Sequence, residues 1–272
     1  MTDHARMAAG RIFVGVGGWS FAPWRGLFYP PGLAQRRELA FMAGKLSAVE
    51  INSTFYGMQK PATYQRWHDE TPDDFVFAVK GPRFASNRSD LATAGPSIQR
   101  FLDSGLLRLG AKLGPINWQL APTKPFVADE IEAFLSSLPG THEGRRLRHA
   151  IEVRHASFAV PEFVELARRH GVAIVLAGDA SYPLIADATA GFAYLRLMGT
   201  IDQEQRGYPA AALTRWARQA RAIAEGSPTK ALTCVPERVA RAGLRDVYLF
   251  VISGAKHRNP AAAMALREKL ED

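Results

Sequence analysis

The chain has 272 residues, 47% of them apolar and 22% charged, a composition typical of a globular protein that buries a core of its own. Its single cysteine, Cys234, excludes an internal disulfide and a cysteine-based metal cluster. The net charge of +8 favours an anionic partner, although arginine supplies 26 of the 34 cations and codon bias can produce such an excess.

No stretch has the pattern of a targeting or membrane-spanning segment. Residues 1–10 lack the apolar run of a secretory signal and are expected to form a disordered leader, followed by a single domain over residues 11–272. No apolar run approaches the roughly 20 residues that span a bilayer, so no membrane partner is expected. Together with the lone cysteine, this pattern favours a cytoplasmic location.

Short apolar runs alternate with helical patterns along the chain. Several runs are apolar on both faces, as strands of a parallel sheet must be when helices cover both sides of it. The expected strands are Ile12–Gly17, Ala48–Thr54, Phe75–Lys80, Ile116–Leu120, Ala150–Arg154, Ala173–Gly178, Phe192–Leu197 and Val247–Ser253.

Helices are expected between these strands, where apolar residues recur every three to four positions. Asn259-Pro260, for example, combines an N-cap residue with a proline at the first helical position. The expected helices are Gln35–Leu46, Ala62–Glu70, Pro96–Leu109, Asp129–Leu138, Pro161–His170, Pro209–Ala224 and Pro260–Leu270.

This alternation predicts an α/β protein built as a single (β/α)8 TIM-type barrel. The helix after the sixth strand is expected to be short or irregular, because Ser181–Ala190 is too short for a full helix. An open doubly wound sheet is the alternative. It is less favoured because polar residues follow nearly every strand and do not gather at one switch point.

In such a barrel, the loops that follow the carboxyl ends of the strands build the site. The candidate residues at these ends are Glu50, Asn52, Lys80, Gln119, Glu152, Arg154, His155, Asp179 and Arg196. Charges from several strands that face one lumen must pair with one another to be tolerated. We therefore expect a connected charge network, in which Glu152 contacts a cation and Arg154 contacts a carboxylate from another strand.

Two interpretations stay open for the acids. Glu50 and Glu152 could be acid–base carboxylates, with His155 as a third catalytic candidate, or structural partners of buried cations. Asp179 could likewise be functional or structural, whereas Lys80 and Arg196 are expected to face a ligand. The sequence has no metal-binding or nucleotide-binding motif and requires no cofactor, although carboxylates could bind a divalent metal.

Aromatic residues crowd the loops after the first two expected strands. Most of them should pack in the core. Trp19 and Tyr56 lie nearest to the strand ends, and we expect these two to stack on a sugar or a base.

Seven segments match a known family pattern: Val14–Trp19, Trp24–Pro30 (WRGLFYP), Val49–Tyr56 (VEINSTFY), Phe75–Lys80, Lys112–Pro115, Glu152–His155 and Tyr194–Leu197. In these segments, which span nearly the whole chain, the sequence resembles the YecE-like family, also described as domain of unknown function 72. The resemblance implies a TIM-type barrel and no particular activity. The chain departs from the family pattern at Met198, where the family commonly has histidine, and at Ser253, where it often has asparagine.

Cations outnumber acids at the expected strand ends, since Lys80, Arg83, Arg154 and Arg196 stand against Glu50, Glu152 and Asp179. We therefore predict a mildly basic pocket and an enzyme that acts on an anionic, phosphorylated sugar or nucleotide, with Glu50 and Glu152 as acid–base candidates. The alternative is a non-catalytic nucleic-acid-binding barrel. It would bind phosphates through the outward arginines of the expected helix Pro209–Ala224, although these residues are also typical of a solvated face. Those arginines are Arg215, Arg218 and Arg221.

Overall fold

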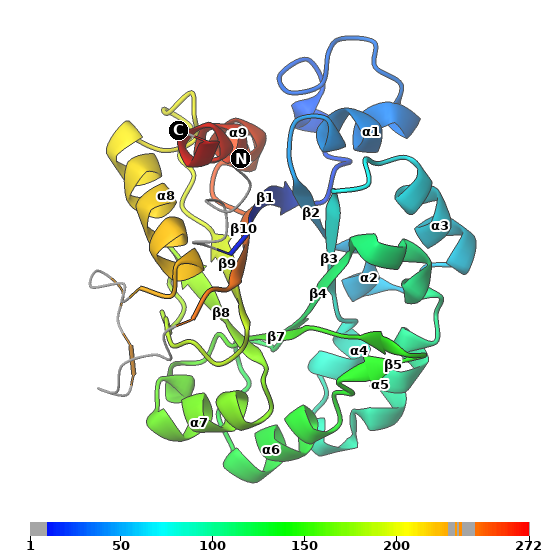
Figure 1. Cartoon of the computed structure of the whole chain (residues 1–272), viewed down its shortest axis with the longest axis vertical. Helices are drawn as coiled ribbons and strands as arrows, with labels where there is room; N and C mark the ends of the chain where they lie inside the picture. Colours follow the sequence, from blue (N-terminus) through cyan, green and yellow to red (C-terminus); the bar gives the residue numbers. More distant parts are fainter. Residues whose placement is uncertain (1–9, 228–231, 233, 236–242, 272) are drawn as a thin grey trace, which may run out of the picture.

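Eight parallel strands close into a barrel in the computed structural model, which describes residues 10–227, 232, 234–235 and 243–271 (Figure 1). Around the barrel the neighbours follow the order β1, β10, β9, β8, β7, β4, β3, β2. The strands are β1 (Ile12–Gly17), β2 (Ala48–Ile51), β3 (Val76–Lys80), β4 (Leu113–Gln119), β7 (His149–Glu152), β8 (Ala173–Gly178), β9 (Phe192–Leu197) and β10 (Asp246–Val251). This closed sheet confirms the predicted α/β barrel and excludes the open doubly wound sheet.

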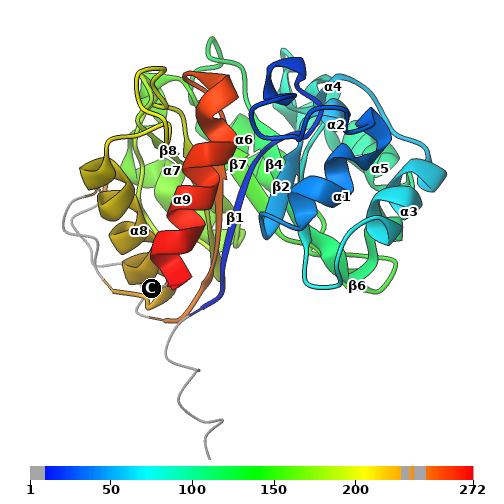
Figure 2. The ribbon, with the colours of Figure 1, turned by 90° about the horizontal axis from the view of Figure 1, so that it is seen from above.

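Helices surround the barrel and cover the outer faces of its strands (Figures 1 and 2). The α-helices are α1 (Glu38–Ala43), α2 (Ser53–Tyr56), α3 (Pro61–Asp69), α4 (Arg83–Ser86), α5 (Gly95–Leu102), α6 (Ala128–Ser136), α7 (Pro161–Arg169), α8 (Ala210–Ala224) and α9 (Asn259–Glu271). The 3₁₀ helices are η1 (Ala22–Trp24), η2 (Gln35–Arg37), η3 (Leu91–Thr93), η4 (Leu106–Lys112), η5 (Ala156–Phe158) and η6 (Lys256–Arg258). In the longer helices, such as α5, α7 and α8, apolar residues recur at helical spacing, so these helices bury one face against the sheet.

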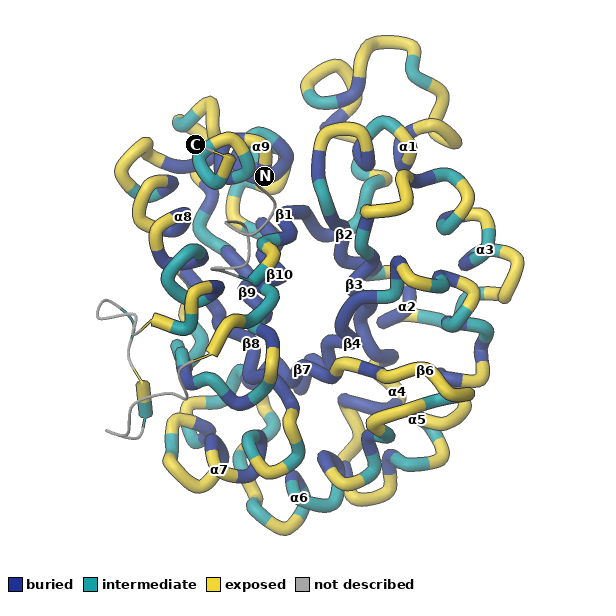
Figure 3. The backbone as a smooth tube through the Cα atoms, viewed as in Figure 1, coloured by how far each residue is buried: buried dark blue, intermediate teal, exposed yellow. Residues whose placement is uncertain are grey.

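The lumen of the barrel is filled by side chains below its carboxyl-end mouth. Residues that alternate along the strands point inward, because successive side chains of a strand face opposite sides. The inner cluster is Phe13, Ala48, Ala78, Ala150, Ala173, Val175, Phe192, Tyr194, Tyr248 and Phe250. Figure 3 shows the strands as a closed wall of buried backbone. Since this lower lumen is a packed core, a ligand can approach the strand-end charges only from the mouth.

The second barrel strand is shorter than predicted. It ends at Ile51, and the chain turns at once into α2, so the predicted strand Ala48–Thr54 was wrong at its carboxyl end. The Thr54 hydroxyl donates to the backbone oxygens of Ile51 (3.2 Å) and Lys80 (2.7 Å), which fixes the turn against the end of β3. Glu50 therefore remains on the inner face of the strand, while Asn52 belongs to the turn that follows it.

The connection after the sixth barrel strand, where the sequence predicted a short or irregular helix, contains no helix at all. Residues 179–191, all described, form turns and extended backbone between β8 and β9. Thr189 stabilises this segment, because its hydroxyl donates to the Val172 carbonyl at 2.6 Å and accepts from the Ile174 amide at 3.1 Å.

A two-stranded hairpin outside the barrel was not predicted. It pairs β5 (Thr141–His142) with β6 (Arg145–Arg146) through a turn at Glu143 and Gly144, both of which have positive φ. Strands of two residues give no hydrophobic alternation, so the sequence pattern holds no signal for them.

The first described residue, Gly10, is the last residue of the expected leader. Of the expected leader, residues 1–9 lie outside the described residues, and the Gly10 amide donates to the Ala224 carbonyl at 3.0 Å. Among the described helices, none is long and apolar enough to cross a bilayer.

Candidate functional site

The centre of the barrel mouth is the guanidinium group of Arg196. It donates from Nη1 to Glu152 Oε2 at 2.6 Å and from Nη2 to Glu50 Oε1 at 3.1 Å. Tyr194, two residues earlier on the same inner face of β9, donates its hydroxyl to the other Glu50 oxygen at 2.6 Å. All four residues are at most 2% exposed. Three strands thus meet in a buried ion-pair network, as predicted from the alternation of their residues.

Arg154 extends this network towards solvent. It lies just beyond the end of β7 and contacts Glu152 Oε1 through Nε at 2.9 Å and through Nη2 at 2.8 Å. Tyr182 lies over its guanidinium, 4.5 Å from the ring centroid, and Asn117 Nδ2 donates to Glu152 at 3.2 Å. We call Glu50, Glu152, Arg154 and Arg196 the mouth network. The expected cation beside Glu152 is confirmed, but the expectation that Arg154 pairs with another strand was wrong.

Opposite charges hold Glu152 and Arg196 in their ionised forms. Burial alone would raise the pKa of Glu152, but Arg196, Arg154 and Lys80 together hold that pKa below its usual value. Burial would likewise lower the pKa of Arg196, whereas Glu152 and Glu50 raise it. Burial and the charge of Glu50 raise the pKa of Tyr194 well above its usual value. Glu152 therefore stays an anion at neutral pH, and Tyr194 stays a hydrogen-bond donor.

Lys80 is a buried cation of the mouth that pairs with no carboxylate in the described part of the chain. It ends β3, is 6% exposed, and donates from Nζ to Gln119 Oε1 at 2.7 Å. The Phe55 ring centroid lies 4.1 Å from Nζ. Burial and the charge of Arg196 lower the pKa of Lys80 to about 8, although the two mouth carboxylates act in the opposite direction. An ammonium group has three donors, so this one retains donors that no described residue accepts.

Two of the three predicted ligand residues from the early loops have packing roles. Asn52 packs against the end of β1, where its amide nitrogen would lie 2.7 Å from a Cβ at position 17 and would have to move if that glycine were replaced. Trp19 is partly buried and meets Trp67 edge-on at 5.1 Å. Tyr56, in contrast, is 70% exposed.

Asp179 is not brought to the mouth network. It follows β8 with a φ of 54°, a left-handed conformation that redirects the chain after the strand. Its carboxylate accepts from Trp216 Nε1 at 2.7 Å and pairs with Arg215 at 3.3 Å. Asp179 therefore anchors α8 to the end of the strand.

His155 also lies apart from the mouth network. Its Nδ1 is 3.3 Å from the Ser157 amide nitrogen and 2.8 Å from the Ser157 hydroxyl, so the ring caps the short helix η5. Accepting from an amide places the ring proton on Nε2. No described residue contacts Nε2.

Asn117, Tyr194 and Tyr182 belong to the site but were not among the predicted site residues. Alternation could have identified the first two, because Asn117 shares a strand face with Gln119 and Tyr194 shares one with Arg196. Tyr182 comes from the irregular segment after β8, for which the sequence offers no periodic signal.

A divalent metal at the mouth does not fit the donors that lie there. Glu50 and Glu152 are both engaged by Arg196, and Lys80 adds a further positive charge nearby. Within the described residues, no group of three or more His, Cys, Asp or Glu side chains could hold a metal ion.

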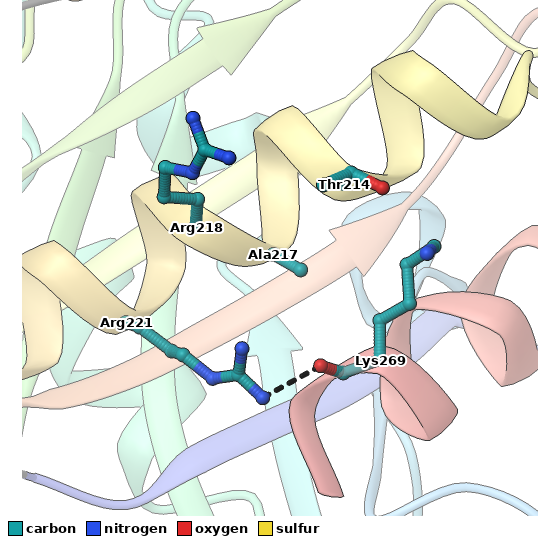
Figure 4. Close-up of a pocket in the computed structure, with 5 residues that line it drawn as sticks. All are labelled: Thr214, Ala217, Arg218, Arg221 and Lys269. Atoms are coloured by element: carbon teal, nitrogen blue, oxygen red, sulfur yellow. Dashed lines mark hydrogen bonds between the residues drawn. The ribbon is translucent and has the colours of Figure 1, made fainter. Parts of the chain in front are cut away.

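A basic groove lies on the outer surface, between α8 and α9 (Figure 4). It has a volume of about 280 Å³ and is lined by Thr214, Ala217, Arg218, Arg221 and Lys269. Arg221 donates to the Lys269 carbonyl at 2.7 Å, satisfying one of the free carbonyls at the end of α9. Arg218 and the Lys269 ammonium contact no carboxylate among the described residues.

Comparison with protein families gives one match over most of the chain. The DUF72 family, described as protein of unknown function DUF72, matches residues 13–272. The UPF0759 protein YecE of Escherichia coli (strain K12) is 32% identical over 150 residues, which cover 54% of this chain and 50% of YecE. The UPF0759 protein YunF of Bacillus subtilis (strain 168) is 32% identical over 69 residues, or 25% of this chain and 23% of YunF. The matched part thus spans half or less of the length of these relatives.

Solved structures of the same family share the barrel. A DUF72 family protein of Thermotoga maritima superposes with a TM-score of 0.73 at 20% identity, covering 96% of this chain and 100% of that one. A DUF72 family protein of Enterococcus faecalis gives a TM-score of 0.71 at 16% identity, covering 96% of both chains. At these identities the likeness concerns the fold alone.

Proposed function

This chain belongs to the DUF72 family, and from the geometry of its barrel mouth we propose that it binds a small anionic molecule there, a phosphorylated sugar or nucleotide. The observation that supports this proposal is the state of Lys80, a buried ammonium whose only hydrogen bond to a described residue goes to the neutral amide of Gln119. Burying a charge without a counter-ion is costly, and such sites are common where a ligand supplies the missing charge.

The balance of paired and unpaired charges at the mouth supports the same proposal. Glu50 and Glu152 are already neutralised by arginines. Lys80 and Arg83, at the end of β3 and the start of α4, have no ion pair with any described carboxylate. The positive charge available to a ligand is therefore concentrated after β3.

Lys80 is also the acid–base group that best suits a reaction at this site. Its pKa of about 8 means that both protonation states are populated near neutral pH, as general acid–base catalysis requires. Glu50 and Glu152, the sequence-based candidates, are fully buried and bound by Arg196. We therefore assign them the structural role that the sequence left open, and Lys80 the catalytic one.

Calorimetric titration with ribose 5-phosphate tests the proposal. Lys80→Met should weaken binding at least about ten-fold, which corresponds to about 1.4 kcal/mol. For the parent protein, affinity should fall as the pH rises through about 8 and Lys80 loses its proton.

Lys45→Met is the matched control, because Lys45 is an exposed lysine before β2 whose ammonium also lies over an aromatic ring, 5.9 Å from the Phe41 centroid. It should leave binding unchanged. Equal affinity for Lys80→Met and the parent, or no binding by either, would overturn the proposal.

A second candidate function, binding of a nucleic-acid backbone, is favoured by the groove between α8 and α9. Two of its cations, Arg218 and Lys269, have no carboxylate partner among the residues that the structure describes. Arg215 is not available in the same way, since it pairs with Asp179. Phosphate groups in the groove could therefore pair with Arg218 and Lys269. They could also accept from the Arg221 donors that the Lys269 carbonyl does not use.

The double variant Arg218→Gln/Lys269→Gln should bind a 20-base-pair DNA duplex more weakly. The slope of log affinity against log salt should become shallower by about 1 to 2, since about one counterion is released per phosphate contact. The control is Lys60→Gln/Arg108→Gln, which removes two exposed cations near α3, across the barrel from α8 (Figure 1). If both double variants behave like the parent in anisotropy titrations, the groove does not bind DNA.

A further inference from the structure

Exposed apolar side chains gather around the barrel mouth. Of the seven large apolar residues that are exposed in the described part of the chain, five lie in connections that follow a strand's carboxyl end. These five are Leu27, Tyr56, Phe84, Val127 and Ile201. Single exposed apolar side chains are common, but several of them grouped at one end of a molecule are typical of an interaction site, so this distribution points to the mouth as a binding surface.

Tyr56 is the most exposed of the five, at 70%, and its ring lies on the side of the mouth that carries Lys80 and Arg83, two cations without an ion pair to any described carboxylate. Its ring meets Phe55 edge-on, with centroids 5.2 Å apart, and Phe55 lies 4.1 Å from Lys80 Nζ. These separations place the Tyr56 ring within about 9 Å of the ammonium. The Arg83 guanidinium is 5.8 Å from the Tyr56 centroid.

Packing does not account for Tyr56. Its hydroxyl makes no hydrogen bond to another described residue, and its ring contacts only Phe55 and Arg83 among the aromatic and cationic groups. An exposed flat ring beside two cations is instead the combination that binds nucleotides, because the ring stacks on a base while the cations neutralise a phosphate.

We propose that the anionic ligand of the mouth is a nucleotide whose base stacks on Tyr56, with its phosphate between Lys80 and Arg83. This inference rests on the proposed anion site and narrows it. A sugar phosphate would use Lys80 and Arg83 but would have no planar group to place on the tyrosine ring. Stacking is tolerant of sequence, so any of the bases would fit.

Paired titrations with adenosine 5′-monophosphate and ribose 5-phosphate test this assignment. Stacking of one base contributes about 1–3 kcal/mol, so Tyr56→Ala should lower the affinity for the nucleotide by roughly 5- to 150-fold. Its affinity for ribose 5-phosphate should change less than about two-fold. Tyr56→Trp should retain or strengthen nucleotide binding. Leu27→Ala, a control at another exposed apolar residue of the rim, should change neither affinity.

The possible outcomes separate this inference from the proposed function. If Lys80→Met abolishes ribose 5-phosphate binding while Tyr56→Ala leaves nucleotide binding intact, the base-stacking role is wrong and the anion site stands. If neither compound binds the parent protein, both are wrong. A single-stranded oligonucleotide that binds more tightly than the mononucleotide, and loses that affinity in Tyr56→Ala, would support stacking and identify a nucleic-acid strand as the source of the base.

Discussion

Replacing Arg196 by methionine is expected to lower the free energy of unfolding by about 3–5 kcal/mol, because the change leaves two buried carboxylates without their shared cation. Glu50 and Glu152 are both 0% exposed, and each contacts one nitrogen of this guanidinium. For a chain of this size, the melting temperature should fall by roughly 10 °C. Urea denaturation at pH 7 measures the effect.

A matched exposed pair and a compensating variant test the cause of that loss. Arg169→Met removes an arginine that is 64% exposed and paired with Glu132, so it should cost less than about 1 kcal/mol. Adding Glu50→Gln to Arg196→Met should recover part of the stability, because Glu50 has no second arginine partner among the described residues, whereas Glu152 keeps Arg154. If this double variant is less stable than Arg196→Met alone, charge imbalance is not the reason.

Lys80→Met is expected to make the protein more stable, in contrast to most buried substitutions. Folding lowers the pKa of Lys80 from 10.5 to about 8, which corresponds to a cost of about 3 kcal/mol at neutral pH. Methionine removes that cost, although it also leaves the Gln119 carbonyl oxygen without its donor. A net gain of about 1–3 kcal/mol should result, together with the loss of anion binding. Stability sacrificed at one residue in this way is typical of a functional site.

The pH dependence of this gain follows from the direction of the pKa shift. Below pH 8 the lysine is charged in both folded and unfolded states, so the parent protein bears the full cost of burying the charge. Between about pH 8 and 10.5 the folded state loses the proton first, and the parent gains stability as the pH rises. The difference between Lys80→Met and the parent should therefore shrink from pH 7 to pH 10 in urea titrations. A parent that is more stable than the variant at pH 7 would instead assign Lys80 a structural role.

The sequence predicted the mouth network better than it predicted the individual contacts. Alternation along the strands placed Glu152 and Arg196 on inner faces, and the structure confirms that they meet. The same reasoning failed beyond the strands. Asp179 adopts a left-handed conformation one residue after β8 and turns to α8, while Arg154 reaches back to Glu152. Successive side chains alternate between the two faces only where the backbone is extended, so this pattern does not predict where side chains in the turns point.

The sequence by itself determined the barrel, its irregular sixth unit and the positions of its charges, since these depend on local periodicity and on caps and turns within each segment. Only the tertiary structure decided which charged side chains contact one another. Glu50 and Arg196 are 146 residues apart on strands that are not neighbours, and closure of the sheet brings them together across the lumen. The environment of Lys80 was decided in the same way. Its burial, its single amide partner and its distance from the carboxylates arise from three-dimensional packing, which sequence spacing does not encode.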